Sequence, residues 1–279
     1  AYELMTSLVV AEMCIRDRIN SDMAITKPVA NTDTVYTCVD NQEKFDSMML
    51  SLQKAHKIAF DTETSDLNPM LASIVGLSFS TNAGSAWYIP VGHSEGLQLS
   101  LEYVIEQLKP IFENPDKQMC AHNANYDLMI LSKYGIHVTN LTFDTMVGAH
   151  LLGNSSLGLK NLSQTLLGID MQPITELIGT GKKQISFSDV SIEEAHPYAA
   201  ADADCTLQLW NHFEPEIDSS FAKNIMSNIE MPLIPVIIEM QRNGITLEKD
   251  NLESMSKELQ SDMEILHESI VAHVGHSLN

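Results

Sequence analysis

The feature of this sequence that most constrains its fold is a set of short strand-like segments that precede and alternate with segments of helical periodicity. Five short segments are either apolar or alternate between apolar and polar residues, which is typical of strands. They are residues 35–39, 57–61, 74–79, 86–90 and 118–121. Apolar residues recur at helical spacing over residues 43–54, 101–112, 127–133, 145–152, 159–167 and 192–210. Five strands with interleaved helices predict an α/β domain built on a mixed sheet.

The character of the chain changes near Asp218. Residues 222–242 and 248–274 have the pattern of two long amphipathic helices, joined at the helix-stop signal Asn243-Gly244. Residues 1–30 show no clean periodicity. We therefore expect a leader of residues 1–30 that is disordered or not native, an α/β domain of residues 31–217, and the incomplete start of another domain in residues 218–279.

The charge balance restricts the possible functions. The 279 residues include 16 Lys and Arg against 37 Asp and Glu, which gives a formal net charge of −21. Because proteins that bind nucleic acid generally neutralise its phosphates with a basic face, this balance argues against a general nucleic-acid binder. A function on nucleic acid must then depend on a local site, on bound metal or on a basic partner domain.

The sequence indicates neither a membrane protein nor a cysteine-based site. No apolar run approaches the roughly 18 residues that cross a bilayer, and the charges around residues 8–18 are in the wrong order for a signal peptide. The cysteines, Cys14, Cys38, Cys120 and Cys205, form no CxxC pair, which argues against zinc or a redox motif. We expect a cytoplasmic protein with reduced thiols.

A first acidic pair, Asp61 and Glu63, follows the apolar segment Ile58-Ala59-Phe60. Residues two apart on a strand point to the same side, so both carboxylates can converge on one point. Hard divalent cations prefer such oxygen ligands. The pair by itself indicates either a metal site or a solvated acidic loop.

A second group lies in the segment 122–127 (HNANYD), between a predicted strand and a predicted helix. Asp127 falls in the first turn of that helix, where a carboxylate suits the helix dipole. Asn123 or Asn125 can cap the same helix. For this motif alone, capping is favoured over catalysis.

A third group, Tyr198 and Asp202, is spaced so that both side chains share one face of a helix. The alanines between them let another element approach closely. A phenol beside a carboxylate can hold a metal-bound water, and an ordinary surface helix is the alternative interpretation.

Together the three groups resemble the DEDD-type 3′-5′ exonucleases with a tyrosine in the third motif, and most closely the proofreading domain of family A DNA polymerases. The strings at 74–79 (IVGLSF), 88–91 (YIPV) and 143–146 (FDTM) are also similar to that family, and residues 229–245 resemble the entry to its polymerase thumb. The resemblance implies a ribonuclease H-like fold, with a mixed five-stranded sheet flanked by helices and followed by a long two-helix segment.

The resemblance also implies a chemistry. Two Mg²⁺ or Mn²⁺ ions would be held by Asp61, Glu63, Asp127 and Asp202, and Tyr198 would complete the catalytic set. The reaction would remove nucleoside 5′-monophosphates from a single-stranded or frayed DNA 3′ end, with a polymerase domain acting in cis. We expect a monomer that does not associate with membranes.

Other residues are candidates for contact with the substrate. They are Thr62, Leu67, Asn123, Tyr126, Lys182 and Lys183, with Lys160 as a further candidate for phosphate contact. Leu67 lies where the family places an apolar wedge against the last bases, although packing on the core is an equal alternative. The lysines are equally well interpreted as solvated surface residues. Asp144 and Asp204 are expected to be structural and to bond backbone groups.

Two other functions compete with proofreading. A ribonuclease D-like RNA exonuclease shares the same metal-binding pattern, but the polymerase-like tail argues against it. A catalytically silent scaffold of a polymerase is the other alternative. Silent domains usually lose metal-binding carboxylates, and all four are present here.

Overall fold

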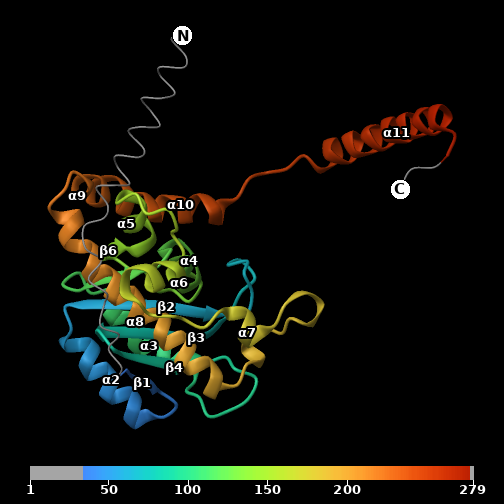
Figure 1. The fold of residues 1–279 in the computed structure, drawn as a ribbon. Coiled ribbons are helices and arrows are strands. Elements are labelled where there is room, and N and C mark those ends of the chain that lie inside the picture. Colours follow the sequence, from blue (N-terminus) through green and yellow to red (C-terminus); the bar gives the residue numbers. More distant parts are fainter. Residues whose placement is uncertain (1–33, 277–279) are drawn as a thin grey trace. The chain divides into compact units, whose positions relative to one another are not determined.

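The computed structural model describes residues 34–276, and its centre is a six-stranded mixed sheet (Figure 1). The strands are β1 (Val35–Cys38), β2 (Lys57–Thr64), β3 (Ile74–Asn82), β4 (Ser85–Pro90), β5 (Gln118–Ala121) and β6 (Leu141–Asp144). Their order across the sheet is β1–β4–β3–β2–β5–β6. Strands β2, β3 and β4 pair antiparallel, whereas β1, β5 and β6 join parallel to their neighbours. The leader predicted for residues 1–30 lies outside the described residues.

The sheet has one strand more than the five that the sequence predicted. Strand β6 pairs with β5, so that Leu141 lies opposite Met119 and Asp144 lies opposite Ala121. Like β1 and β5 it contains only 4 residues, a length at which the local pattern predicts some strands and not others. The predicted α/β class and the mixed sheet are confirmed.

Helices follow and flank the strands. They are α2 (Gln42–Lys54), α3 (Leu101–Phe112), α4 (Ala124–Lys133), α5 (Thr145–Leu151), α6 (Leu159–Leu162), α7 (Ile174–Ile178), α8 (Ile192–Asp218), α9 (Ala222–Ile225), α10 (Met231–Asn243) and α11 (Lys249–Val274). Short 3₁₀ or π turns are η1 (Ser163–Leu167), η2 (Gly181–Lys183), η3 (Phe187–Asp189) and η4 (Met226–Glu230). Most helices lie where periodicity predicted them, but α4 begins earlier and α8 continues to Asp218.

One face of the sheet carries large aromatic side chains. Phe60 on β2 lies opposite Phe79 on β3, and both are fully buried. The ring of Phe112 from α3 packs against both of them, with ring centroids 5.1 Å and 5.7 Å away. This face and the helices on it form the main apolar core.

Helix α8 covers the opposite face and crosses the strands (Figure 1). On this face Asp61 of β2 lies opposite Ser78 of β3, which lies opposite Tyr88 of β4. Tyr88 packs in a small cluster that includes the buried alanines Ala195 and Ala199 of α8. Because alanine side chains are short, the helix can approach the sheet closely at this point.

The described chain divides into two compact units at Ile238 and Glu239. The second unit contains α11, none of whose residues is buried. Its apolar side chains recur every three to four residues on the exposed surface, so α11 is amphipathic as predicted. Among residues 34–276, none of the helices combines the length and the apolar character that crossing a bilayer demands.

Candidate active site and metal centre

The first predicted acidic pair lies within β2 rather than beyond its end, because the strand continues to Thr64. Glu63 is only 9% exposed and Asp61 is half-buried, so the solvated-loop alternative is wrong. Gly76 lies opposite Glu63. The ring of Tyr88 fills the space beside this glycine, where a Cβ atom would come within 2.2 Å of Tyr88 Oη. A glycine is therefore required for Tyr88 to pack here.

Helix α8 adds the third predicted group to this face. Tyr198 and Asp202 are each 8% exposed, so they do not belong to an ordinary surface helix. The Tyr198 phenol lies beside the Asp202 carboxylate, and each group shifts the pKa of the other. One carboxylate oxygen from each of Asp61, Glu63 and Asp202 lies within 4.8 Å of the other two. The structure thus brings the first and third groups together.

The donor set of this cluster fits a divalent cation. Glu63 Oε1 and Asp202 Oδ1 are buried and have no hydrogen-bond partner among the described residues. A buried anionic oxygen without a partner is costly, and a hard cation removes that cost by coordinating it. Three clustered carboxylates with two unsatisfied oxygens are therefore a suitable site for Mg²⁺ or Mn²⁺.

The carboxyl pKa values reflect the same crowding. Burial raises the pKa of Asp61 to about 6. Burial, followed by the charge of Asp61, raises the pKa of Asp202 to about 8. Burial, followed by the charges of Asp61 and Asp202, also raises the pKa of Glu63 well above its ordinary value. Burial is the largest cause of each shift, and it opposes the charged form of the carboxyl group.

Asp127 lies beside this cluster but is held differently. It is 3% exposed and lies in the first turn of α4. Its Oδ1 accepts hydrogen bonds from the backbone N–H of Thr62, at 3.0 Å, and from the Thr62 hydroxyl, at 2.5 Å. Burial, followed by the charge of Asp61, raises the pKa of Asp127. Its participation in metal binding stays a prediction, as does substrate contact by the buried Thr62.

The N-terminus of α4 is capped from another strand rather than by its own asparagines. Asn123 precedes α4 in the left-handed conformation, with φ of 65°, and its side chain makes no capping hydrogen bond. Asn125 lies inside the helix. The Asp144 carboxylate accepts hydrogen bonds from the N–H groups of Asn123, Ala124, Met146 and Val147. It therefore caps both α4 and α5, and the predicted structural role of Asp144 is confirmed.

Asp204 is structural as predicted. Its carboxylate accepts hydrogen bonds from the Tyr36 hydroxyl, the Gly84 N–H and the Gln208 amide, at 2.9, 2.8 and 3.0 Å. The bonds to Tyr36 and Gly84 fasten α8 to β1 and to the turn before β4. They fix the helix that carries Tyr198 and Asp202.

The candidate substrate residues differ in their exposure and in their contacts. Leu67 is 91% exposed, so the alternative that it packs on the core is wrong. The Tyr126 hydroxyl donates to the carbonyl of Asp66 at 2.6 Å, which connects α4 to the loop that carries Leu67. Asn123 and Lys183 are exposed, and the side chain of Lys182 lies outside the described part of the chain. Contact of these residues with a substrate stays a prediction.

Ser78 also lies on this face, although its position in the sequence does not indicate this. Its Oγ is buried without a hydrogen-bond partner among the described residues, and it lies opposite Asp61. The alternation of residues 74–79 places Ser78 and Gly76 on one side of a strand. Only the pairing register of β2 with β3 shows that this side is the one that carries the carboxylates.

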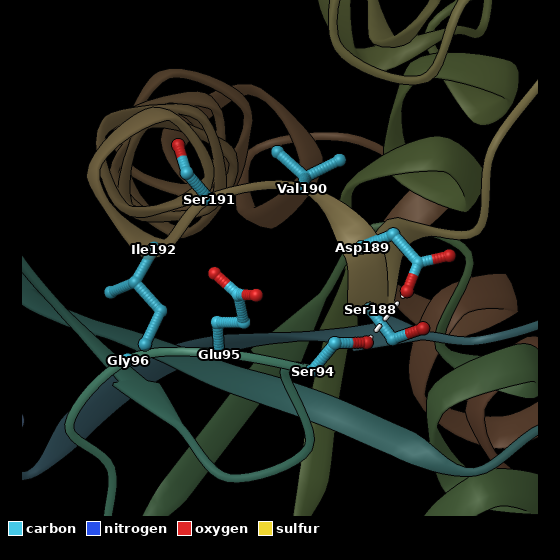
Figure 2. Close-up of a pocket in the computed structure, with 8 residues that line it drawn as sticks. All are labelled: Ser94, Glu95, Gly96, Ser188, Asp189, Val190, Ser191 and Ile192. Carbon is cyan, nitrogen blue, oxygen red and sulfur yellow. Dashed lines mark hydrogen bonds between the residues drawn. The ribbon is translucent and has the colours of Figure 1, made fainter.

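A separate cavity of about 490 Å³ lies at the N-terminus of α8 (Figure 2). It is lined by residues 94–96 and 188–192. Ser94 Oγ donates to Asp189 Oδ1 at 2.6 Å across it, and Ser191 caps α8. None of the predicted site residues lines this cavity.

Comparison with known proteins agrees with this arrangement. A family model described as 3′-5′ exonuclease matches residues 36–218, which is well over half of the chain. The chain belongs to this 3′-5′ exonuclease family. The chain is also 36% identical over 256 residues to DNA polymerase I of Chloroflexus aurantiacus, an alignment that covers 91% of this chain and 27% of that protein. The chain spans about a quarter of the length of the curated relatives that it matches.

Solved structures show the same fold at low sequence identity. The polymerase domain of Pol1 from M. smegmatis, in complex with DNA primer-template and dNTP, matches with a TM-score of 0.66 and 17% identity, over 87% of this chain and 38% of that one. NrnC from Brucella melitensis with bound Mg²⁺ matches with a TM-score of 0.55 and 18% identity, over 76% and 94%. The ribonuclease H-like fold predicted from the resemblance is confirmed.

Proposed function

We propose that this chain is a metal-dependent 3′-5′ exonuclease that removes nucleoside 5′-monophosphates from DNA 3′ ends, as the proofreading part of a longer DNA polymerase. The observation that carries the proposal is the convergence of Asp61, Glu63 and Asp202 from β2 and α8. The family match and the DNA polymerase I relatives support the reaction class.

Two Mg²⁺ or Mn²⁺ ions are the proposed cofactors. Asp61, Glu63 and Asp202 would hold one ion, and Asp61 with the neighbouring Asp127 would hold the other. Bound cations supply a water of lowered pKa and a positive charge that faces the phosphate. That charge matters because the chain itself has a formal net charge of −21 and would otherwise repel DNA.

Tyr198 and Glu63 have complementary hydrogen-bonding roles in this proposal. Burial and the charge of Asp202 raise the pKa of Tyr198, so its phenol stays protonated and remains a donor at neutral pH. With a cation bound nearby, Glu63 would be ionised and would act as an acceptor. Such a donor and acceptor together orient a water for attack on the terminal phosphodiester.

The proposed substrate is the single-stranded or frayed 3′ end of DNA. The exposed Leu67 is available to stack against the last base. Asn123, Tyr126 and the lysines of η2 are the candidate contacts for sugar and phosphate. A polymerase domain in cis would deliver the primer end, and we propose that the protein is a cytoplasmic monomer.

A direct assay tests the proposal. The purified chain is incubated with a 5′-labelled single-stranded DNA oligonucleotide, with Mg²⁺ or with EDTA, beside Asp61→Ala and the exposed control Lys54→Met. We expect stepwise release of 5′-mononucleotides that requires both the metal and Asp61 and is unchanged in the control. Substituting one central carboxylate should reduce the rate by about 10³-fold, equivalent to ~4 kcal/mol.

The alternatives predict different results in the same assay. Equal rates on RNA and DNA would favour a ribonuclease D-like enzyme. Metal binding by calorimetry without degradation of either polymer would favour a silent scaffold.

A further inference from the structure

One cation of the described chain lies close to the carboxylate cluster without forming an ion pair with it. Lys160 is half-buried in the short helix α6. Its charge lowers the pKa of Asp61, of Glu63 and of Asp202, in each case against the larger effect of burial. In the part of the chain that the structure describes, none of the ion pairs includes Lys160.

The ammonium group of Lys160 is held by two contacts. Its Nζ lies 4.0 Å from the centroid of the Tyr198 ring, which is a close cation–π distance. The same Nζ donates a hydrogen bond to the carbonyl oxygen of Gln172, in the segment between η1 and α7. These contacts distinguish Lys160 from a solvated surface lysine, whose side chain would sample many rotamers.

We propose that Lys160 is a positioning residue, which holds the Tyr198 ring in place and acts as a resident cation that competes with the metal for the three carboxylates. The metal and the exonuclease reaction rest on the proposed function. The contact with Tyr198, and the proximity of a positive charge to the carboxylates, are independent of the proposed function.

Removing the charge of Lys160 should strengthen metal binding but weaken the positioning of Tyr198. Without Lys160 the cluster is more negative, so a divalent cation should bind more tightly. Without the cation–π contact the Tyr198 ring is free to adopt other rotamers, so the orientation of its hydroxyl is less well defined. A lysine that served only for packing would produce neither effect.

The experiment uses the chain with Lys160→Met, which keeps the apolar stem, and with Lys160→Arg, which keeps the charge and the cation–π contact. Lys54→Met on the exposed surface of α2 is a matched control for charge. Calorimetric titration with Mn²⁺ should show about five- to tenfold tighter binding in Lys160→Met, and unchanged binding in Lys160→Arg and in the control.

Exonuclease turnover provides a second measurement. At saturating metal, kcat of Lys160→Met should fall about tenfold with little change in KM, because only the orientation of Tyr198 is lost. In a Tyr198→Leu background the same substitution should no longer reduce turnover, yet should still tighten Mn²⁺ binding. Equal Mn²⁺ affinity in Lys160→Met and the unaltered chain would overturn the proposal. Tighter Mn²⁺ binding in a chain without any nuclease activity would support Lys160 and contradict the proposed function.

Discussion

The two faces of the sheet use the same strands for opposite purposes. On one face, Phe60 and Phe79 pack against Phe112 in the main apolar core. On the other, the adjacent residues Asp61 and Ser78 face α8, and three carboxylate oxygens converge there. Because successive residues of a strand point to opposite sides, one element can be stabilised by one face and carry a chemically costly site on the other. The comparison implies that removing a ring from the first face should destabilise the fold, whereas removing a charge from the second should stabilise it.

The largest expected effect comes from breaking the aromatic face. Phe60→Ala should destabilise the fold by about 3–5 kcal/mol, because it removes a fully buried ring and leaves a cavity against Phe112. Thermal unfolding should show a decrease in Tm of about 10 °C. Phe221→Ala, at a site that is 77% exposed, is the matched control and should unfold like the unaltered chain. An equal loss in both would contradict the assignment of this face as the main core.

A smaller effect is expected from filling the space beside the site. Gly76→Ala places a methyl group 2.2 Å from Tyr88 Oη, so the ring must move. Tyr88 also bonds to Nε2 of His93 at 2.6 Å, which resists that movement. We expect a loss of about 1–3 kcal/mol in the free energy of unfolding.

Activity provides a second measurement on this variant. Exonuclease activity in Gly76→Ala should fall as well, because Tyr88 is displaced beside Glu63. Gly158→Ala is the control, since a Cβ there meets nothing within 4 Å. A Gly76→Ala variant as stable and active as this control would show that the face with the carboxylates tolerates a larger side chain at this position.

The smallest expected effect is a gain in stability when Asp202, on the face of the sheet that carries the carboxylates, is replaced by asparagine. Because the pKa of Asp202 is raised to about 8, the folded state resists its ionisation, whereas the unfolded chain ionises it near pH 4. Stability is therefore fully present at low pH and is lost as the pH rises from about 4 to about 8. In EDTA at pH 8, Asp202→Asn should unfold about 2–5 °C higher than the unaltered chain, while at pH 4 the difference should vanish.

Added metal reverses this comparison. With Mg²⁺ in excess the unaltered chain should gain stability by mass action, and Asp202→Asn should gain less because it lacks one ligand. Glu253→Gln on the exposed α11 controls for the loss of one negative charge. A lower Tm of Asp202→Asn in EDTA at pH 8 would show that the cluster does not oppose folding.

Much of the site could be predicted because its residues are close in sequence. The spacing of Asp61 and Glu63, and of Tyr198 and Asp202, is set by the geometry of a single strand or helix. The bond of Asp127 to Thr62, and the placement of Ser78, depend on how separate elements pair. Local periodicity carries no information on that pairing.

The same limit explains the errors in the fold. The pattern over the 4 residues of β6 does not by itself decide between a strand and a loop, and the pairing with β5 is what defines the strand. Capping of α4 was assigned to a neighbouring asparagine, whereas the cap is Asp144, which is distant in sequence. Long-range hydrogen bonds of a carboxylate cannot be predicted from the residues beside it.

The capping by Asp144 has a consequence for the order of folding. Its carboxylate, at the end of β6, fastens the first turn of the helix that carries Asp127. Helix α4 can therefore reach its final position only after the edge strand has joined β5, which requires contacts between distant parts of the chain. We expect the carboxylate cluster to be among the last regions to form during refolding, so that binding of a divalent cation should report a completely assembled sheet.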